Sequence, residues 1–268
     1  RLKDITLGQY FPGNSIAHKL DPRTKILLVT LYIIALFSAK GWMGYAVMAV
    51  TLAACVKVSH VGLRALVRGL KPLVFIIAFT GILNMFFTPD THYLWEWGIL
   101  RVSVKGIENA LFMVIRIMLL VMGTFLMTYT TSPIRLTDGL ESLLNPLKKI
   151  HVPVHELAMM MAIALRFIPT LIEETDKIMS AQKARGADFD SGNIFQKAKA
   201  LVPILVPLFI SAFRRADELA TAMECRCYHG GEGRTKLHVL KYQRRDYVAL
   251  AGGVVILALV VVLRRLGT

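Results

Sequence analysis

Two stretches of the sequence repeat one pattern that ends in arginine. Residues 176–185 read DKIMSAQKAR and residues 217–226 read DELATAMECR, so they share D-x-[IL]-x-[ST]-A-x-x-x-R without a gap. Each stretch follows an apolar segment with proline and precedes glycine, so we expect two helices that each end in one arginine. A guanidinium can bind a carboxylate through two hydrogen bonds while its stem packs on apolar walls. The pattern therefore predicts that Arg185 and Arg226 dock a two-fold or pseudo-two-fold partner.

A simpler interpretation of these arginines stays open. A cation at a helix C-terminus is stabilised by the helix dipole and needs no partner. The repetition of the same spacing on two segments favours docking over this simpler interpretation.

Other patterns that carry chemistry are weak or absent. The sequence contains no Gly-Lys pair, which excludes the phosphate-binding loop of a nucleotide hydrolase. Cys225, Cys227 and His229 offer three closely spaced metal ligands without a second pair, so small packing residues around Arg226 are the favoured interpretation. Arg116 lies within an apolar run and is expected to face the interior of a helix bundle or to reach the membrane surface. We expect no catalytic residue, cofactor or metal in this chain.

The elements that must carry the arginines belong to an apolar and basic chain. Of its 268 residues, 55% are hydrophobic and 19% are charged, with a formal net charge of +14. This combination indicates a bilayer rather than nucleic acid as the partner. Five apolar runs approach the ~20 residues that cross a membrane as helix. They cover residues 25–39, 42–56, 72–88, 106–130 and 247–263.

The sequence predicts an all-α integral membrane protein with about five transmembrane helices and long cytoplasmic coupling helices. Residues 1–130 form an N-terminal membrane bundle of four spans, residues 131–245 a cytoplasmic coupling-helix region, and residues 246–268 a C-terminal transmembrane helix. With the N-terminus in the cytoplasm, 26 of the 32 basic residues lie in cytoplasmic segments. A sixth span over residues 157–172 is a further possibility, interrupted by Arg166 and Pro169.

Two shorter segments are expected to lie at the inner membrane surface. Residues 200–213 (ALVPILVPLFISAF) are too short to span and contain two prolines, which predicts a kinked helix that lies on the membrane or packs under the bundle. Residues 60–70 carry Arg64 and Arg68 four positions apart with leucines between, which predicts a basic amphipathic helix. Asp21 and Pro22 are placed as N-cap and first residue of the first span, with Arg23 and Lys25 at its inner boundary.

The N-terminal strings GQYFPGNS (residues 8–15) and HKLDPRTK (residues 18–25) resemble the transmembrane T-component of energy-coupling factor transporters, the EcfT/CbiQ-like family. The run from Arg166 to Gly186 resembles the first Ala-Arg-Gly motif of that family, and residues 217–227 resemble the second, so the resemblance covers essentially the whole chain. The second motif departs from the family pattern because it has Cys225-Arg226-Cys227. This departure puts the left-handed turn at Cys227 in question and moves it to Gly230 as an alternative.

The resemblance implies a non-catalytic coupling subunit in the cell membrane of a prokaryote. It would join two ABC-type ATPases, identical or different, which bind ATP and Mg²⁺, to a substrate-binding membrane S-component that takes up a vitamin or a transition-metal ion. The implied ATPase-binding residues are Ala184, Arg185, Gly186, Cys225, Arg226 and Cys227. The apolar faces expected to contact the S-component carry Leu157, Met160, Met161, Leu165, Leu201, Leu205, Leu208 and Phe209.

Two other classes of function remain as alternatives. One is a self-contained permease or pore with a basic cytoplasmic regulatory region that binds anionic lipid. The other is a membrane-embedded enzyme of unrecognised type. Polar lining within the spans is scarce and convergent titratable groups are missing, so both are weaker than the coupling function.

Overall fold

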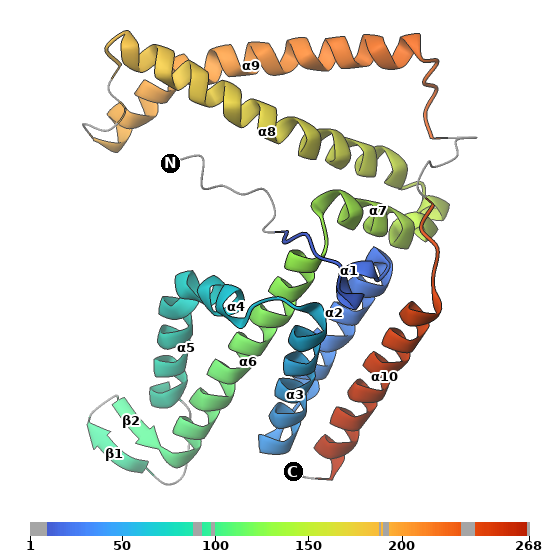
Figure 1. Ribbon diagram of the computed structural model, residues 1–268. Coiled ribbons are helices and arrows are strands. Elements are labelled where there is room, and N and C mark those ends of the chain that lie inside the picture. The colour runs from blue at the N-terminus through green and yellow to red at the C-terminus, as the bar shows by residue number, and fades with distance from the viewer. Residues whose placement is uncertain are drawn as a thin grey trace. The chain divides into compact units, whose positions relative to one another are not determined.

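The computed structural model describes residues 10–87, 93–97, 100–187, 189, 193–231 and 239–266, and these form two compact units (Figure 1). One unit, called the bundle below, comprises residues 8–142 and 240–268. The other contains residues 143–239. This second unit begins twelve residues later and ends six residues earlier than the predicted coupling region at 131–245. The chain therefore leaves the bundle once and returns to it once.

The bundle is built almost entirely of helices. Its helices are α1 (Ile16–Lys19), α2 (Pro22–Ser38), α3 (Gly41–Ser59), α4 (Leu63–Leu70), α5 (Val74–Phe87), α6 (Val104–Thr130), α7 (Pro133–Leu144, whose last two residues fall in the other unit) and α10 (Arg244–Arg265). A 3-10 turn, η2 (Lys71–Leu73), joins α4 to α5. Strands β1 (Tyr93–Trp97) and β2 (Leu100–Ser103) form an antiparallel hairpin that the sequence analysis did not predict. The all-α membrane fold class is confirmed, with this small hairpin added.

The second unit is built around two long helices. It contains the 3-10 helix η3 (Asn145–Ile150), α8 (Val154–Ala184, 31 residues) and α9 (Ile194–Cys225, 32 residues). We call α8 and α9 the helix pair. The apolar segment 200–213, predicted as a kinked helix on the membrane or under the bundle, lies within α9, and α9 is helical on both sides of Pro203 and Pro207.

Apolar side chains hold the bundle together. Leu36 on α2, Met48 on α3 and Val260 on α10 are fully buried in one core, together with Leu66 on α4. Helices α2 and α6 approach closely at Gly123, where a Cβ atom would lie 2.5 Å from Cε1 of Tyr32. Only glycine leaves room for the Tyr32 ring there, which positions the hydroxyl to donate to the Leu119 carbonyl at 3.0 Å.

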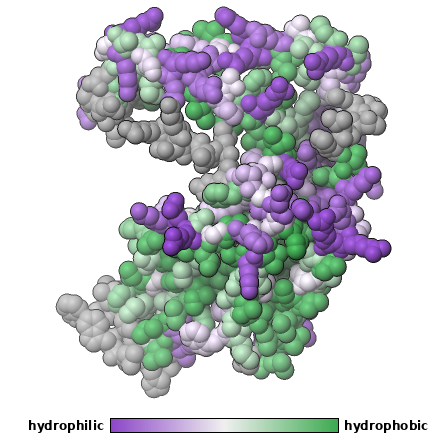
Figure 2. Space-filling model, viewed as in Figure 1, coloured by the Kyte–Doolittle hydropathy of each residue, from purple (hydrophilic) through white to green (hydrophobic). Residues whose placement is uncertain are grey.

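Five helical segments are long and apolar enough to cross a membrane. They are α3, the stretch from α4 through α5 (Leu63–Phe86), α6, α8 and α10. Helix α2, which contains the predicted first span, has 17 residues and therefore stands at the lower end of the spanning range of roughly 17–25 residues. Helix α8 contains the possible sixth span at residues 157–172. Figure 2 shows mainly hydrophobic side chains over the bundle helices, and hydrophilic side chains mixed with hydrophobic ones over the helix pair.

Arg116 of α6 faces another helix of the bundle. Its Nε donates to the hydroxyl of Tyr45 on α3 at 2.8 Å. Its guanidinium also lies 5.7 Å from the ring centroids of Phe37 and Tyr45. Of the two expected placements, the interior of the bundle and the membrane surface, the structure shows the first, with the guanidinium against two aromatic rings and one hydroxyl.

Candidate functional site

The helix pair is antiparallel and is joined by polar contacts as well as apolar ones (Figure 1). Glu174 of α8 accepts a hydrogen bond from the Ser211 hydroxyl and an ion-paired hydrogen bond from Arg215 Nη2 at 2.7 Å, both on α9. One carboxylate therefore ties two successive turns of the opposite helix. This pairing fixes which faces of α8 and α9 meet.

A second contact shows how α9 accommodates its prolines. Pro207 has no N–H, so the carbonyl of Pro203 four residues earlier lacks its intrahelical donor. The Gln182 side chain of α8 donates to that carbonyl at 3.5 Å. The missing helical hydrogen bond is thus replaced by a contact with the partner helix.

Both helices of the pair end in the same backbone motif. Arg185 is the C-cap of α8, Gly186 follows in the left-handed conformation with φ of 86°, and the Ala187 N–H donates to the Gln182 carbonyl at 3.0 Å. This six-to-one hydrogen bond defines the Schellman motif, which satisfies the last carbonyls of a helix.

The end of α9 repeats this geometry residue for residue. Arg226 is the C-cap, Cys227 is left-handed with φ of 54°, and the Tyr228 N–H donates to the Met223 carbonyl at 3.0 Å. The left-handed turn therefore stays at Cys227, and Gly230 adopts a further positive φ of 94°. The prediction of two helices that each deliver one arginine at the C-terminal end is confirmed.

The two arginines project from opposite ends of the pair. The contacts between α8 and α9 extend from Gln182 and Pro203 at one end to the apolar hollow lined by Ile163 and Met223 at the other. At ~1.5 Å per residue, this contact zone is about 30 Å long. Arg185 and Arg226 are exposed, and within the described part of the chain neither guanidinium makes a hydrogen bond or ion pair. The remaining predicted docking residues, Ala184, Gly186, Cys225 and Cys227, are exposed as well.

Most of the residues predicted to contact the S-component are exposed in the structure. Six of its eight residues are exposed, with Met160 at 56% and Phe209 at 62%, and two are half-buried. The exposed residues are Leu157, Met160, Met161, Leu201, Leu205 and Phe209, and the half-buried residues are Leu165 and Leu208. Between α8 and α9 lies an apolar hollow of about 330 Å³ lined partly by Phe167 and Leu219. Contact with an S-component stays a prediction for these residues.

The cysteine-rich end of α9 does not assemble a metal site in the described residues. No group of three His, Cys, Asp or Glu side chains stands in ligating geometry among them. Cys225 and Cys227 are free thiols on the surface. They flank Arg226, the C-cap of α9.

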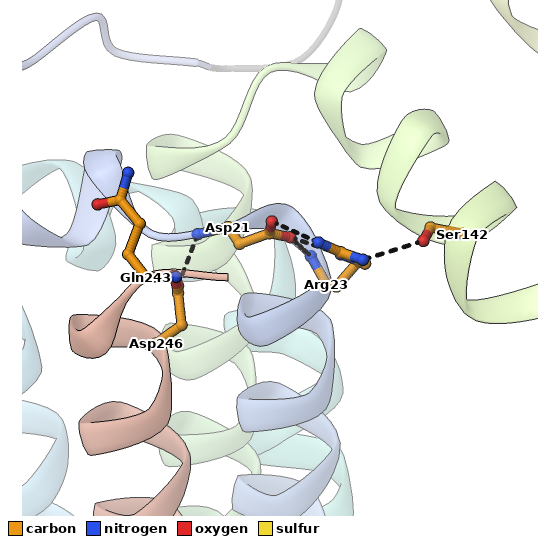
Figure 3. A network of polar contacts seen from close by, with 5 residues as sticks. All are labelled: Asp21, Arg23, Ser142, Gln243 and Asp246. Atoms are coloured by element: carbon orange, nitrogen blue, oxygen red, sulfur yellow. Dashed lines mark hydrogen bonds and ion pairs between the residues drawn. The ribbon is translucent and has the colours of Figure 1, made fainter. Parts of the chain in front are cut away.

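The N-terminal motif forms a polar junction within the bundle (Figure 3). Asp21 caps α2 by accepting from the Arg23 N–H at 2.9 Å, as predicted, and also pairs with the Arg23 guanidinium at 3.0 Å. The Arg23 guanidinium reaches Ser142 of α7 at 3.3 Å and lies 4.0 Å from the ring centroid of Tyr242. Arg23 therefore contacts the bundle on both sides of the excursion made by residues 143–239.

Two features of this junction were not predicted. Asp246 of α10, which is 2% exposed, accepts from the Asp21 N–H at 2.9 Å and from the Gln243 N–H at 2.7 Å. Lys25 does not anchor the membrane boundary. It is buried and donates from Nζ to the Thr130 carbonyl at 2.8 Å, since the end of α6 leaves that carbonyl without a helical donor.

The residues of the N-terminal motif that precede Asp21 are held by hydrogen bonds at the same end of the bundle. His18 is buried, with Nδ1 2.6 Å from the Ser15 hydroxyl and Nε2 2.9 Å from the Phe11 carbonyl. The Phe11 N–H donates to the Tyr129 carbonyl at 3.0 Å, which holds the segment on α6. A hollow of about 200 Å³ separates these residues from the turn between α3 and α4.

The bundle and the helix pair together define a class of protein. It is a multi-pass helical membrane protein with two matched helix ends that each carry an exposed arginine. Residues 13–237 match the family described as cobalt transport protein, CbiQ. Curated relatives named energy-coupling factor transporter transmembrane protein EcfT are also similar to this chain. The protein of Ruminiclostridium cellulolyticum is 52% identical over 98% of both chains, and that of Clostridium kluyveri is 56% identical over 92% of both chains.

The protein of Bacillus subtilis is 46% identical over 98% of this chain and 99% of its own length. The chain belongs to the family of energy-coupling factor transporter transmembrane proteins. These relatives are named as transporter components rather than as enzymes.

Proposed function

We propose that this chain couples two cytoplasmic ABC-type ATPases to a separate substrate-binding membrane subunit. ATP and Mg²⁺ bind in the ATPases, and their closure moves the helix pair, which acts on the S-component. The cargo is a vitamin or a transition-metal ion. The N-terminus and the helix pair lie on the cytoplasmic side, where the basic residues concentrate.

The matched geometry of the two helix ends is the observation that supports this proposal. Each end presents an exposed arginine that pairs with none of the described residues, one residue before a left-handed turn. A pair of related subunits offers two equivalent grooves, and each groove requires one such end. The contacts of Glu174 join the helices, so a displacement of one end is passed to the other helix.

Co-purification with the ATPases tests the proposal directly. The tagged chain is expressed with the ATPase pair of its own genome, as wild type, Arg185→Glu, Arg226→Glu and the double variant. Each single reversal is expected to lower the retained ATPase about tenfold or more, as for a central interface arginine, and the double variant is expected to abolish binding.

Arg214→Glu is the matched control because Arg214 is an exposed arginine on α9 away from its end. It is expected to retain the ATPases. Equal binding by the double variant and the wild type would overturn the proposal. Uptake by liposomes that contain this chain without an ATPase would favour the self-contained permease instead.

A further inference from the structure

Helix α4 divides its surface into three sectors. At 100° per residue, Arg64, Arg68 and Lys71 fall within a sector of about 60°. All three side chains are exposed. Leu63 and Val67 lie on the adjacent sector and are 63% and 55% exposed. A basic sector next to an exposed apolar one is the pattern of a helix that lies in a membrane interface.

The third sector holds α4 firmly on the bundle. Leu66 and Leu70 are buried. Gly69 lies against α6, where a Cβ atom would stand 2.5 Å from Cε2 of Phe125. The Tyr129 hydroxyl donates to the Ala65 carbonyl at 3.5 Å. The orientation of α4 about its axis is therefore set by packing, which leaves the basic and apolar sectors facing outward.

Helix α4 lies between two apolar segments of the chain. It follows the candidate span α3 and leads through η2 into the apolar helix α5. The exposed apolar residues continue from Leu63 and Val67 to Val74 and Phe75 at the start of α5. The basic sector thus stands where the apolar surface of the bundle begins.

The charges of the three cations are not neutralised by any of the described residues. Across the described residues, Arg64, Arg68 and Lys71 form no ion pair or hydrogen bond through their side chains. We propose that they bind the headgroup phosphates of anionic phospholipids, while Leu63 and Val67 contact the acyl chains of the same leaflet. Charge complementarity and continuity with the apolar surface both select a lipid as the occupant. This inference is independent of the proposed coupling function.

Spin-labelled lipids provide the test. The full chain is reconstituted in phosphatidylcholine bilayers that contain a trace of spin-labelled phosphatidylglycerol or spin-labelled phosphatidylcholine. The wild type is expected to immobilise phosphatidylglycerol preferentially. In the triple variant Arg64→Gln, Arg68→Gln, Lys71→Gln, this preference is expected to fall about fivefold for each residue that contacts a headgroup at low salt. High salt is expected to weaken the wild-type preference.

Two further variants make the outcome specific. Arg64→Lys with Arg68→Lys keeps the charge and is expected to keep the preference, with circular dichroism to verify the fold. Lys183→Gln, Lys199→Gln, Arg214→Gln removes three exposed cations from the helix pair and is expected to leave the preference unchanged. The proposal fails if wild type shows no preference, if both triple variants lose it equally, or if the α4 variant only loses a protein partner.

Discussion

Cys227 adopts a left-handed backbone conformation that costs an L-residue roughly 1–2 kcal/mol relative to the right-handed one. Gly186 occupies the equivalent position of α8, where glycine bears no such cost. The Schellman hydrogen bonds at the end of α9 hold Cys227 in place despite this cost. The two ends are therefore alike in geometry and unlike in local strain.

This difference leads to opposite effects of substitution at the two positions. Cys227→Gly is expected to raise the free energy of unfolding by less than ~1 kcal/mol, because relief of strain exceeds the added flexibility of the unfolded chain. Gly186→Ala is expected to lower it by ~1 kcal/mol, although the added methyl group meets no atom within 4 Å. Thermal unfolding of the detergent-solubilised chain measures both changes.

Gly252→Ala serves as the control for this prediction. Gly252 lies within α10, is exposed, and would also place a Cβ atom in open space. Its helical backbone suits alanine, so this variant is expected to be no less stable than the wild type. Equal destabilisation by both alanine substitutions would contradict the role of the positive φ angle.

At the scale of elements, one carboxylate forms the ion pair that joins α8 to α9. The Glu174 and Arg215 side chains are 23% and 32% exposed, so solvent reduces the strength of their ion pair. A double-mutant cycle with Glu174→Gln and Arg215→Gln is expected to give a coupling energy of about 0.5–1 kcal/mol.

Glu173→Gln is the matched control, since Glu173 is the exposed neighbour of Glu174 on α8. It is expected to show no coupling to Arg215→Gln in the same unfolding measurement. A coupling energy near zero for Glu174 would mean that apolar contacts alone align the helices.

The sequence predicts those features of the elements that depend on neighbouring residues. The two helix ends are read from helix formers followed by a breaker, and Asp21 followed by Pro22 marks the start of α2. The bond between Asp246 and the Asp21 N–H joins residues 225 positions apart, so no local pattern reveals it. The burial of Lys25 likewise depends on the end of α6, which only tertiary packing brings near.

Helix α9 shows where a local pattern predicts only part of an element. Its two prolines predict a kinked helix over residues 200–213, and α9 is longer, running from 194 to 225 with its first part at an angle to the rest (Figure 1). The Gln182 side chain of α8 supplies a donor to the carbonyl that Pro207 leaves free. This tertiary contact compensates for the hydrogen bond that Pro207 cannot make, and the local sequence does not reveal it.

At the scale of the whole molecule, the side of the membrane that the helix pair faces follows from the proposed orientation. Cys225 and Cys227 are exposed free thiols on α9 and its end, so they report on that side. In a Cys55→Ala background, a membrane-impermeant maleimide is expected to label inverted vesicles and not right-side-out ones. Cys225→Ala with Cys227→Ala removes the signal and is the control.

Labelling only in right-side-out vesicles would reverse the orientation and place the arginines away from any cytoplasmic ATPase. In vesicles prepared without the ATPases, labelling in neither type of vesicle would place the end of α9 inside the bilayer. Either result would contradict the predicted cytoplasmic position of the helix pair.

The return of the chain to the bundle has a consequence for biosynthesis. Asp246 and Gly253 of α10 meet α2 at the Asp21 N–H and at Leu28. About 220 residues separate the starts of these helices, so a ribosome adding ~5–20 residues per second delivers α10 roughly 10–45 s after α2. During that interval the Asp21 amide lacks its carboxylate acceptor and α2 lacks a neighbour on one side. Nascent α2 must therefore be shielded by lipid or by the insertion machinery until the last helix arrives.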